Sequence, residues 1–151
     1  CSRPRCGPCS TRPVARGAAA AGIGGEVTVV RGQDVRITLR VRDPAGENFG
    51  GRSPEVKRID LIRGDLTGPV AARTADANPT TRVERRFTPA DWVREGEVIT
   101  FTTTLRNVQA SGYIRIRGTG TGEDEPAADT AGENPWDDLW FYANPVFIKV
   151  R

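Results

Sequence analysis

The stretch Asp34–Asp43, DVRITLRVRD, decides the fold class of this chain. Apolar residues alternate there with arginine and threonine, so every second side chain is apolar. A period of two is typical of a strand with one buried face and one solvated face. We therefore expect a strand with an arginine-rich outer face and four core residues: Val35, Ile37, Leu39 and Val41.

On both sides of this stretch the chain contains further short segments rich in β-branched and aromatic residues, separated by Gly, Pro, Asn and Asp. The expected strands are Glu26–Val30, Val56–Arg63, Val70–Thr74, Thr81–Phe87, Val98–Leu105, Tyr113–Gly118, Asp138–Tyr142 and Val146–Arg151. The expected further core residues are Ile59, Leu61, Phe101, Leu105, Ile114 and Ile116. Asn144 and Pro145 are expected to form the turn between the last two strands.

One segment, Thr88–Glu95, has helical signals, because Thr88 suits an N-cap and Pro89 suits the first helical position. It is long enough for one or two turns, with Trp92 packed on a sheet. The fold class predicted for the chain is all-β, an antiparallel Ig-like β-sandwich with one short helical turn and an extended N-terminal tail.

The composition changes near residue 26. Residues 1–25 are mostly Gly, Ala, Pro, Arg and Cys, offer little to bury, and predict a flexible tail. Residues 26–151 are the expected sandwich domain. Two long polar loops, at 43–54 and 118–135, interrupt it and are candidates for function or mobility.

The net charge of +3 comes from the tail, since the first sixteen residues contain four arginines and no acid. The rest of the chain is close to neutral, which argues against a nucleic-acid partner. No segment has the length and apolarity of a transmembrane helix. Because the chain contains no histidine, serine–histidine, cysteine–histidine and histidine-based metal chemistries are excluded within it, and we expect no enzyme activity.

The three cysteines, Cys1, Cys6 and Cys9, all lie in the tail, so they cannot cross-link the predicted domain. Cys6 and Cys9 have the CxxC spacing of redox and zinc sites, but neither a second ligand pair nor a strand–helix context accompanies them. The first residue is a cysteine and not a methionine, which suggests a processed end, a lost signal peptide or a lipid anchor. We expect an extracytoplasmic location, secreted or at the cell surface.

Seven carboxylates and no basic residue lie between Arg117 and Lys149. Oxygen donors clustered on a loop suit calcium, and the expected ligands are Asp124, Asp129, Glu133 and Asp137. Two other interpretations stay open: a solvated acidic loop, and an electrostatic partner for the basic faces of the Arg36/Arg40/Arg42 or Arg115/Arg117 strands. A glycosidase pair would need carboxylates held at fixed spacing, which neighbours on a loop do not provide.

Aromatic residues concentrate near the C-terminus, in NPWDDLWFYANPVF (134–147). Exposed Trp and Tyr rings form stacking platforms for sugars, whereas rings on terminal strands usually cover a sheet. The second interpretation is favoured, with Trp140 and Phe141 as core residues. The first keeps a calcium-dependent carbohydrate-binding module among the alternatives.

Four strings now carry a family resemblance. They are IDLIRGDLTGP (59–69), ANPTTRVERRF (77–87) with Asp91 and Trp92, YIRIRGT (113–119) and ENPWDDLWFYANPVFIKV (133–150). Together they resemble the C-terminal β-sandwich region of secreted bacterial phosphoesterase-like proteins whose N-terminal part is a PHP-type metal-dependent hydrolase. The resemblance implies a structural role for the matching strands. None of the family's catalytic histidines has a counterpart in this chain.

Three hypotheses follow. In the first, the chain is a noncatalytic, extracytoplasmic accessory or interaction domain whose partner is a phosphoesterase-like hydrolase domain. In the second, it is a self-associating surface or filament protein whose edge strands and residues 1–25 contact other copies. In the third, it is a calcium-dependent carbohydrate-binding module.

Overall fold

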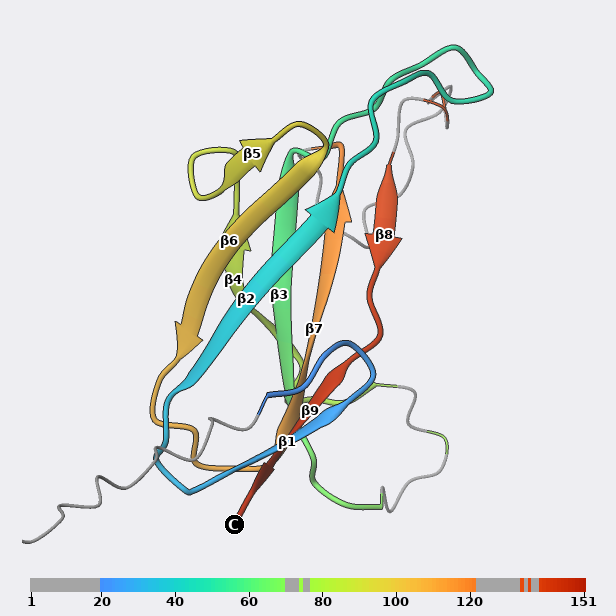
Figure 1. The fold of residues 1–151 in the computed structure, drawn as a ribbon. Helices are drawn as coiled ribbons and strands as arrows, with labels where there is room; N and C mark the ends of the chain where they lie inside the picture. Colours follow the sequence, from blue (N-terminus) through green and yellow to red (C-terminus); the bar gives the residue numbers. More distant parts are fainter. Residues whose placement is uncertain (1–19, 70–73, 75–76, 122–133, 135, 137–138) are drawn as a thin grey trace, which may run out of the picture.

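A computed structural model of the chain describes residues 20–69, 74, 77–121, 134, 136 and 139–151. The described residues form two packed β-sheets and no helix (Figure 1). The predicted all-β sandwich is therefore confirmed, while the Ig-like subtype stays a prediction. No described helix has the length and apolarity needed to cross a bilayer.

The larger sheet has six strands in the order β1 (Glu26–Val29), β9 (Val146–Val150), β7 (Gly112–Thr119), β3 (Arg58–Asp65) and β4 (Arg82–Phe87), with β8 (Trp140–Tyr142) also paired to β7. The smaller sheet has the order β2 (Val35–Arg42), β6 (Val98–Leu105) and β5 (Val93–Glu95). All described pairs are antiparallel except β1 with β9, which run parallel. The antiparallel prediction is thus wrong for this one pair.

The core lies between the two sheets, where alternate residues of facing strands meet. Ile59 and Ile99 are fully buried, and the Phe87 and Phe101 rings are 4.3 Å apart between their centroids. Seven of the ten predicted core residues are buried: Ile37, Ile59, Leu61, Phe101, Leu105, Ile114 and Ile116. The other three, Val35, Leu39 and Val41, pack against the core but are only partly buried.

The predicted helical turn at Thr88–Glu95 is wrong. The carboxylate of Asp91 accepts a hydrogen bond from the Thr88 backbone N–H at 2.9 Å, and the Asp91 N–H donates to the Thr88 carbonyl oxygen at 2.8 Å. These bonds close a single turn. The chain then enters β5, which pairs with β6, so pairing with a neighbouring strand replaces the helix that the capping signals favoured. Trp92 packs as expected, with its ring centroid 6.3 Å from that of Phe101.

The turn expected at Asn144 and Pro145 is not formed, although these residues do connect the last two strands. Both β8 and β9 run antiparallel to β7, one beside residues 117–119 and the other beside 112–114. The two strands therefore follow one another along the same edge of β7 (Figure 1). Between them, Ala143 keeps one contact, because its N–H donates to the Ile116 carbonyl oxygen at 2.9 Å.

The expected strand at Val70–Thr74 lies outside the described residues except for Thr74, which is in a turn. The expected tail is described from residue 20 onward. There, Gly24 donates its N–H to the carbonyl oxygen of Pro145 at 3.0 Å, and the N–H of Phe147 donates to the Gly25 carbonyl oxygen at 2.9 Å. These bonds hold residues 24–25 against the start of β9.

Candidate functional site

The two sheets are unequal, and the described residues leave the sandwich open along one side. β2 pairs with β6 on one side, and no described strand pairs with its other side (Figure 1). Across from this free edge lie β7, β8 and β9 of the larger sheet. Seven partly buried apolar residues line the cavities on this side: Val27, Val35, Leu39, Val41, Leu139, Phe141 and Val146. We call the space between them the β2 groove.

One half of the β2 groove is a cavity of about 410 Å³. Its β2 wall includes Val35, Ile37 and Leu39. Its opposite wall is formed by residues of the larger sheet: Val27, Ile114, Ile116, Val146 and Ile148. Residues 20–23 also line this cavity. The lining is apolar on both sides, so the cavity exposes surface that a further strand would bury.

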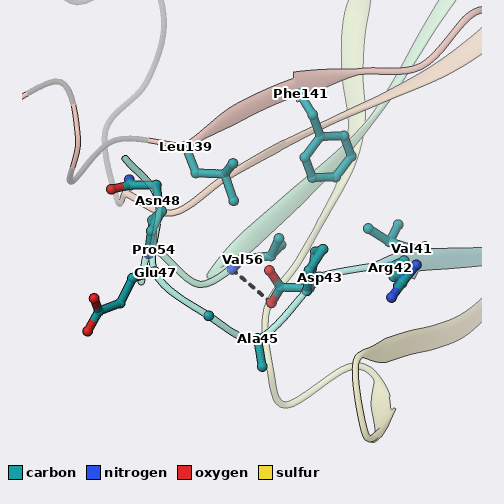
Figure 2. Close-up of a pocket in the computed structure, with 12 residues that line it drawn as sticks. Val41, Arg42, Asp43, Ala45, Glu47, Asn48, Pro54, Val56, Leu139 and Phe141 are labelled. Atoms are coloured by element: carbon teal, nitrogen blue, oxygen red, sulfur yellow. Dashed lines mark hydrogen bonds between the residues drawn. The ribbon is translucent and has the colours of Figure 1, made fainter. Parts of the chain in front are cut away.

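The other half is a cavity of about 540 Å³ at the C-terminal end of β2. Figure 2 shows Leu139 and Phe141 extending into the same space as Val41 and Val56. The segment from Pro44 to Asn48 covers one side of this cavity. The two cavities share β2 as a wall, so together they follow the strand along its length.

Ion pairs fix the end of the groove. The buried carboxylate of Asp43 accepts a hydrogen bond from the Val56 N–H at 3.2 Å (Figure 2). It also accepts one from the Arg94 guanidinium at 2.5 Å. Beside it, Glu97 accepts from the Arg42 guanidinium at 2.9 Å and from the Ala45 N–H at 3.1 Å. The Arg42 hydrogen bond is the main reason why the pKa of Glu97 lies below its ordinary value.

The 43–54 loop, expected to be long and polar, is organised by one side chain. The Asn48 side-chain oxygen accepts from the N–H groups of Gly50 and Arg52 at 3.0 and 3.1 Å, and its amide donates to the Trp136 carbonyl oxygen at 2.7 Å. The Phe49 and Trp136 rings also meet, with centroids 5.7 Å apart. These contacts hold the loop beside the groove.

The solvent side of β2 is basic. Arg36 and Arg40 are exposed, line the edge of the smaller cavity, and form no ion pair with any described residue. Thr38 between them meets Thr102 of β6 at 3.3 Å between the two hydroxyl oxygens. The β2 groove therefore has an apolar interior and a cationic rim.

The outer face of the larger sheet carries a second arginine cluster, which differs from the rim because its charges are partnered. Asp60 is 1% exposed, and its Oδ2 accepts a 2.9 Å hydrogen bond from Nε of Arg117. Its Oδ1 lies 3.6 Å from Nε of Arg58 and 3.5 Å from Nε of Arg86, without a hydrogen bond to either described group. One buried carboxylate thus faces three guanidinium groups.

Aromatic rings cover this cluster. The guanidinium carbons of Arg58 and Arg117 lie 6.0 and 5.7 Å from the Trp140 ring centroid. That of Arg115 lies 5.4 Å from the Tyr142 centroid. Trp140 and Tyr142 stack at 6.4 Å with 15° between their planes. Trp140 was expected in the core, but it lies on the outer face of the sheet. Phe141 points inward, as expected. The Trp140 ring already contacts two guanidinium groups and the Tyr142 ring, so it is poorly placed to stack on a sugar.

The predicted metal ligands Asp124, Asp129, Glu133 and Asp137 all lie outside the described residues. Among the part of the chain that the structure describes, no three Asp, Glu or Cys side chains come together to hold a metal ion. The cysteines Cys1, Cys6 and Cys9 also lie outside the description, since they belong to residues 1–19.

Comparison with known protein families, with curated proteins and with solved structures gave no match to this chain. The resemblance to the sandwich of PHP-type hydrolases therefore stays a hypothesis. Sequence reasoning found β2 and its basic face but missed the groove, because alternation does not reveal which strand edges stay unpaired. The half-exposed apolar wall of β2 has no separate sequence signal.

Proposed function

We propose that this chain is a noncatalytic interaction domain that binds an extended segment of a partner protein along the free edge of β2. The single observation that carries this proposal is the β2 groove, an unpaired strand edge beside apolar core residues. Adding a strand to such an edge supplies main-chain hydrogen bonds, while alternate side chains of the partner enter the space between the sheets. Burial of the exposed apolar lining adds to the affinity.

The chemistry of the groove favours binding over bond breaking. The charged groups at its end are already engaged, Asp43 with Arg94 and Glu97 with Arg42. Its interior is aliphatic and aromatic. Following the family resemblance, we propose a phosphoesterase-like hydrolase domain as the partner and an extracytoplasmic location for both. The isolated chain is expected to hydrolyse no aryl phosphate above background, with or without divalent metal; metal-dependent turnover would contradict a noncatalytic role.

Self-association through β2 is the weaker alternative. Pairing the β2 strands of two copies would continue the smaller sheet and place two rows of arginines on one face. Like charges opposite one another on neighbouring strands are destabilising. Light scattering over a range of concentrations tests this directly, and a dimer that persists at micromolar concentration would favour the alternative.

The test of the proposal uses a displayed library of random twelve-residue peptides, followed by amide hydrogen exchange with the best synthetic peptide. Strand addition protects the β2 amides that do not bond to β6, so exchange should slow at alternate residues of Val35–Arg42. The amides of β4, at an edge of the other sheet, serve as the internal control. Failure to enrich any peptide, or protection confined to β4, would overturn the proposal.

A further inference from the structure

The charge and shape of the β2 groove identify the kind of segment that fits it, if the proposed strand addition is correct. We infer that the partner is an extended segment in which apolar residues alternate with acidic residues. Its apolar side chains enter the cavity between the sheets, and its carboxylates lie beside Arg36 and Arg40 on the solvent side of β2.

The apolar residues of the partner segment follow from the apolar lining of the smaller cavity. A strand hydrogen-bonded to the free edge of β2 continues the smaller sheet, and every second side chain then points between the sheets. It meets Val35, Ile37 and Leu39 on one wall and Val146 and Ile148 on the other. A polar side chain there would lose its hydration without gaining a partner.

The acidic residues of the partner segment follow from the cationic rim of the groove. Side chains directly opposite on neighbouring strands have Cβ atoms about 5 Å apart, which lets a carboxylate reach a guanidinium. Arg36 and Arg40 are exposed and have no ion pair among the described residues, whereas Arg42 is already engaged by Glu97. The rim therefore offers two cations, four residues apart on one face of the strand.

Charge also disfavours two other occupants. The first sixteen residues of this chain contain four arginines and no acid, so this segment would place cations beside cations. A second copy that pairs through its own β2 would likewise place arginines beside arginines. A separate acidic segment avoids both repulsions.

Three synthetic peptides test the inference. The first alternates valine with glutamate over eight residues, the second alternates valine with lysine, and the third joins four valines to four glutamates. Calorimetry measures the affinity of each, and amide exchange of β2 reports where it binds. We expect the alternating glutamate peptide to bind at least about tenfold more tightly than the lysine peptide, since each cross-strand charge contact contributes a factor of a few.

Two charge variants test whether Arg40 determines which peptide binds more tightly. Arg40→Glu leaves one cation, Arg36, and one anion on the rim, so the preference should disappear and the glutamate and lysine peptides should bind with equal affinity. Lys149→Glu is the matched control, because it changes the net charge equally from an exposed position on β9 whose side chain alternates with the groove-lining Ile148. It should leave the preference intact. Both positions are exposed, so unchanged melting temperatures are expected and confirm that the variants fold.

The possible outcomes separate the inference from the proposed function. If both alternating peptides protect β2 with equal affinity, the acidic chemistry is wrong and strand addition stands. If the third peptide, in which four valines are joined to four glutamates, binds as tightly as the alternating glutamate peptide, the binding does not depend on alternation and the inference fails. If no peptide protects β2, the inference and strand addition both fail.

Discussion

Replacing Asp60 by asparagine should destabilise the fold strongly, although Asp60 lies on the outer face of a sheet. The carboxylate is 1% exposed, and the side chains of Arg58 and Arg117 beside it are only 9% and 12% exposed. Asparagine keeps the shape and an oxygen acceptor but removes the carboxylate charge that these guanidinium groups face. The variant therefore isolates the effect of the charge.

The expected magnitude follows from the burial of the groups that remain. Removing one partner of a buried ion pair typically costs about 3–5 kcal/mol, because the other charge stays buried without compensation. The amide oxygen of the introduced asparagine would still accept from Arg117, and Arg58 and Arg117 keep their other contacts, so the loss should lie at the lower end of this range, about 3 kcal/mol. Against a total stability of about 5–15 kcal/mol, this is a large fraction, and it corresponds to a fall of roughly 10 °C in the melting temperature.

Urea unfolding at neutral pH measures the change in unfolding free energy from the shift in midpoint at constant slope. Asp34→Asn is the matched control, because Asp34 is about half exposed and lies 4.0 Å from the exposed Arg106. That substitution should cost less than about 1 kcal/mol and lose its effect in high salt. The Asp60 effect should persist in salt. If Asp60→Asn unfolds within about 1 kcal/mol of the unsubstituted chain, the cluster does not depend on this charge and the reasoning is refuted.

Four further measurements test other parts of the structure. Leu105→Ala, at a residue 3% exposed, should cost about 2–5 kcal/mol of unfolding free energy, and Leu39→Ala clearly less, because Leu39 lines the open groove; equal losses would argue that the groove is closed in solution. Gly118→Ala should cost about 1–3 kcal/mol, since its Cβ would overlap the Phe141 ring, and combining it with Phe141→Ala should give less than the sum of the two losses. The pKa of Glu97 is lowered on folding, so its contribution to stability is full above the ordinary value of 4.5 and is lost as the pH falls through the lowered pKa; Glu97→Gln should weaken this part of the acid dependence, and an unchanged acid limb would contradict it. If calcium binds the acidic segment, a hundredfold excess over its Kd should raise the unfolding free energy by about 2.7 kcal/mol relative to chelator, whereas an unchanged melting midpoint would remove the calcium site.

The sequence predicted the strands well because alternation is a local property. The segment DVRITLRVR forms β2 almost as expected, and Ile37 is buried in it. Val35, Leu39 and Val41 obey the same alternation and yet stay partly exposed. Their burial depends on how many strands lie opposite, and β2 is the last described strand of the smaller sheet. The apolar–polar alternation within one strand does not show which distant strands pair with it or face it.

The helical expectation failed for a related reason. Thr88 and Asp91 form a single local turn and no helix. The three residues Val93–Glu95 then pair with Val98–Leu105, which the chain reaches after a tight turn at Gly96 with a φ of 59°. Pairing with an existing strand outweighs the weak propensity of a segment too short to be a stable helix.

Arginine rows on two strands look alike in the sequence, and the structure separates them. In β7, Arg115 and Arg117 face Tyr142, Trp140 and Asp60, so their charges already have partners within the fold. In β2, Arg36 and Arg40 flank an apolar cavity and have no counter-charge among the described residues. The first row is explained by stability alone. The second gains nothing from the fold as described, and an acidic strand at the free edge would give both of its guanidinium groups a partner.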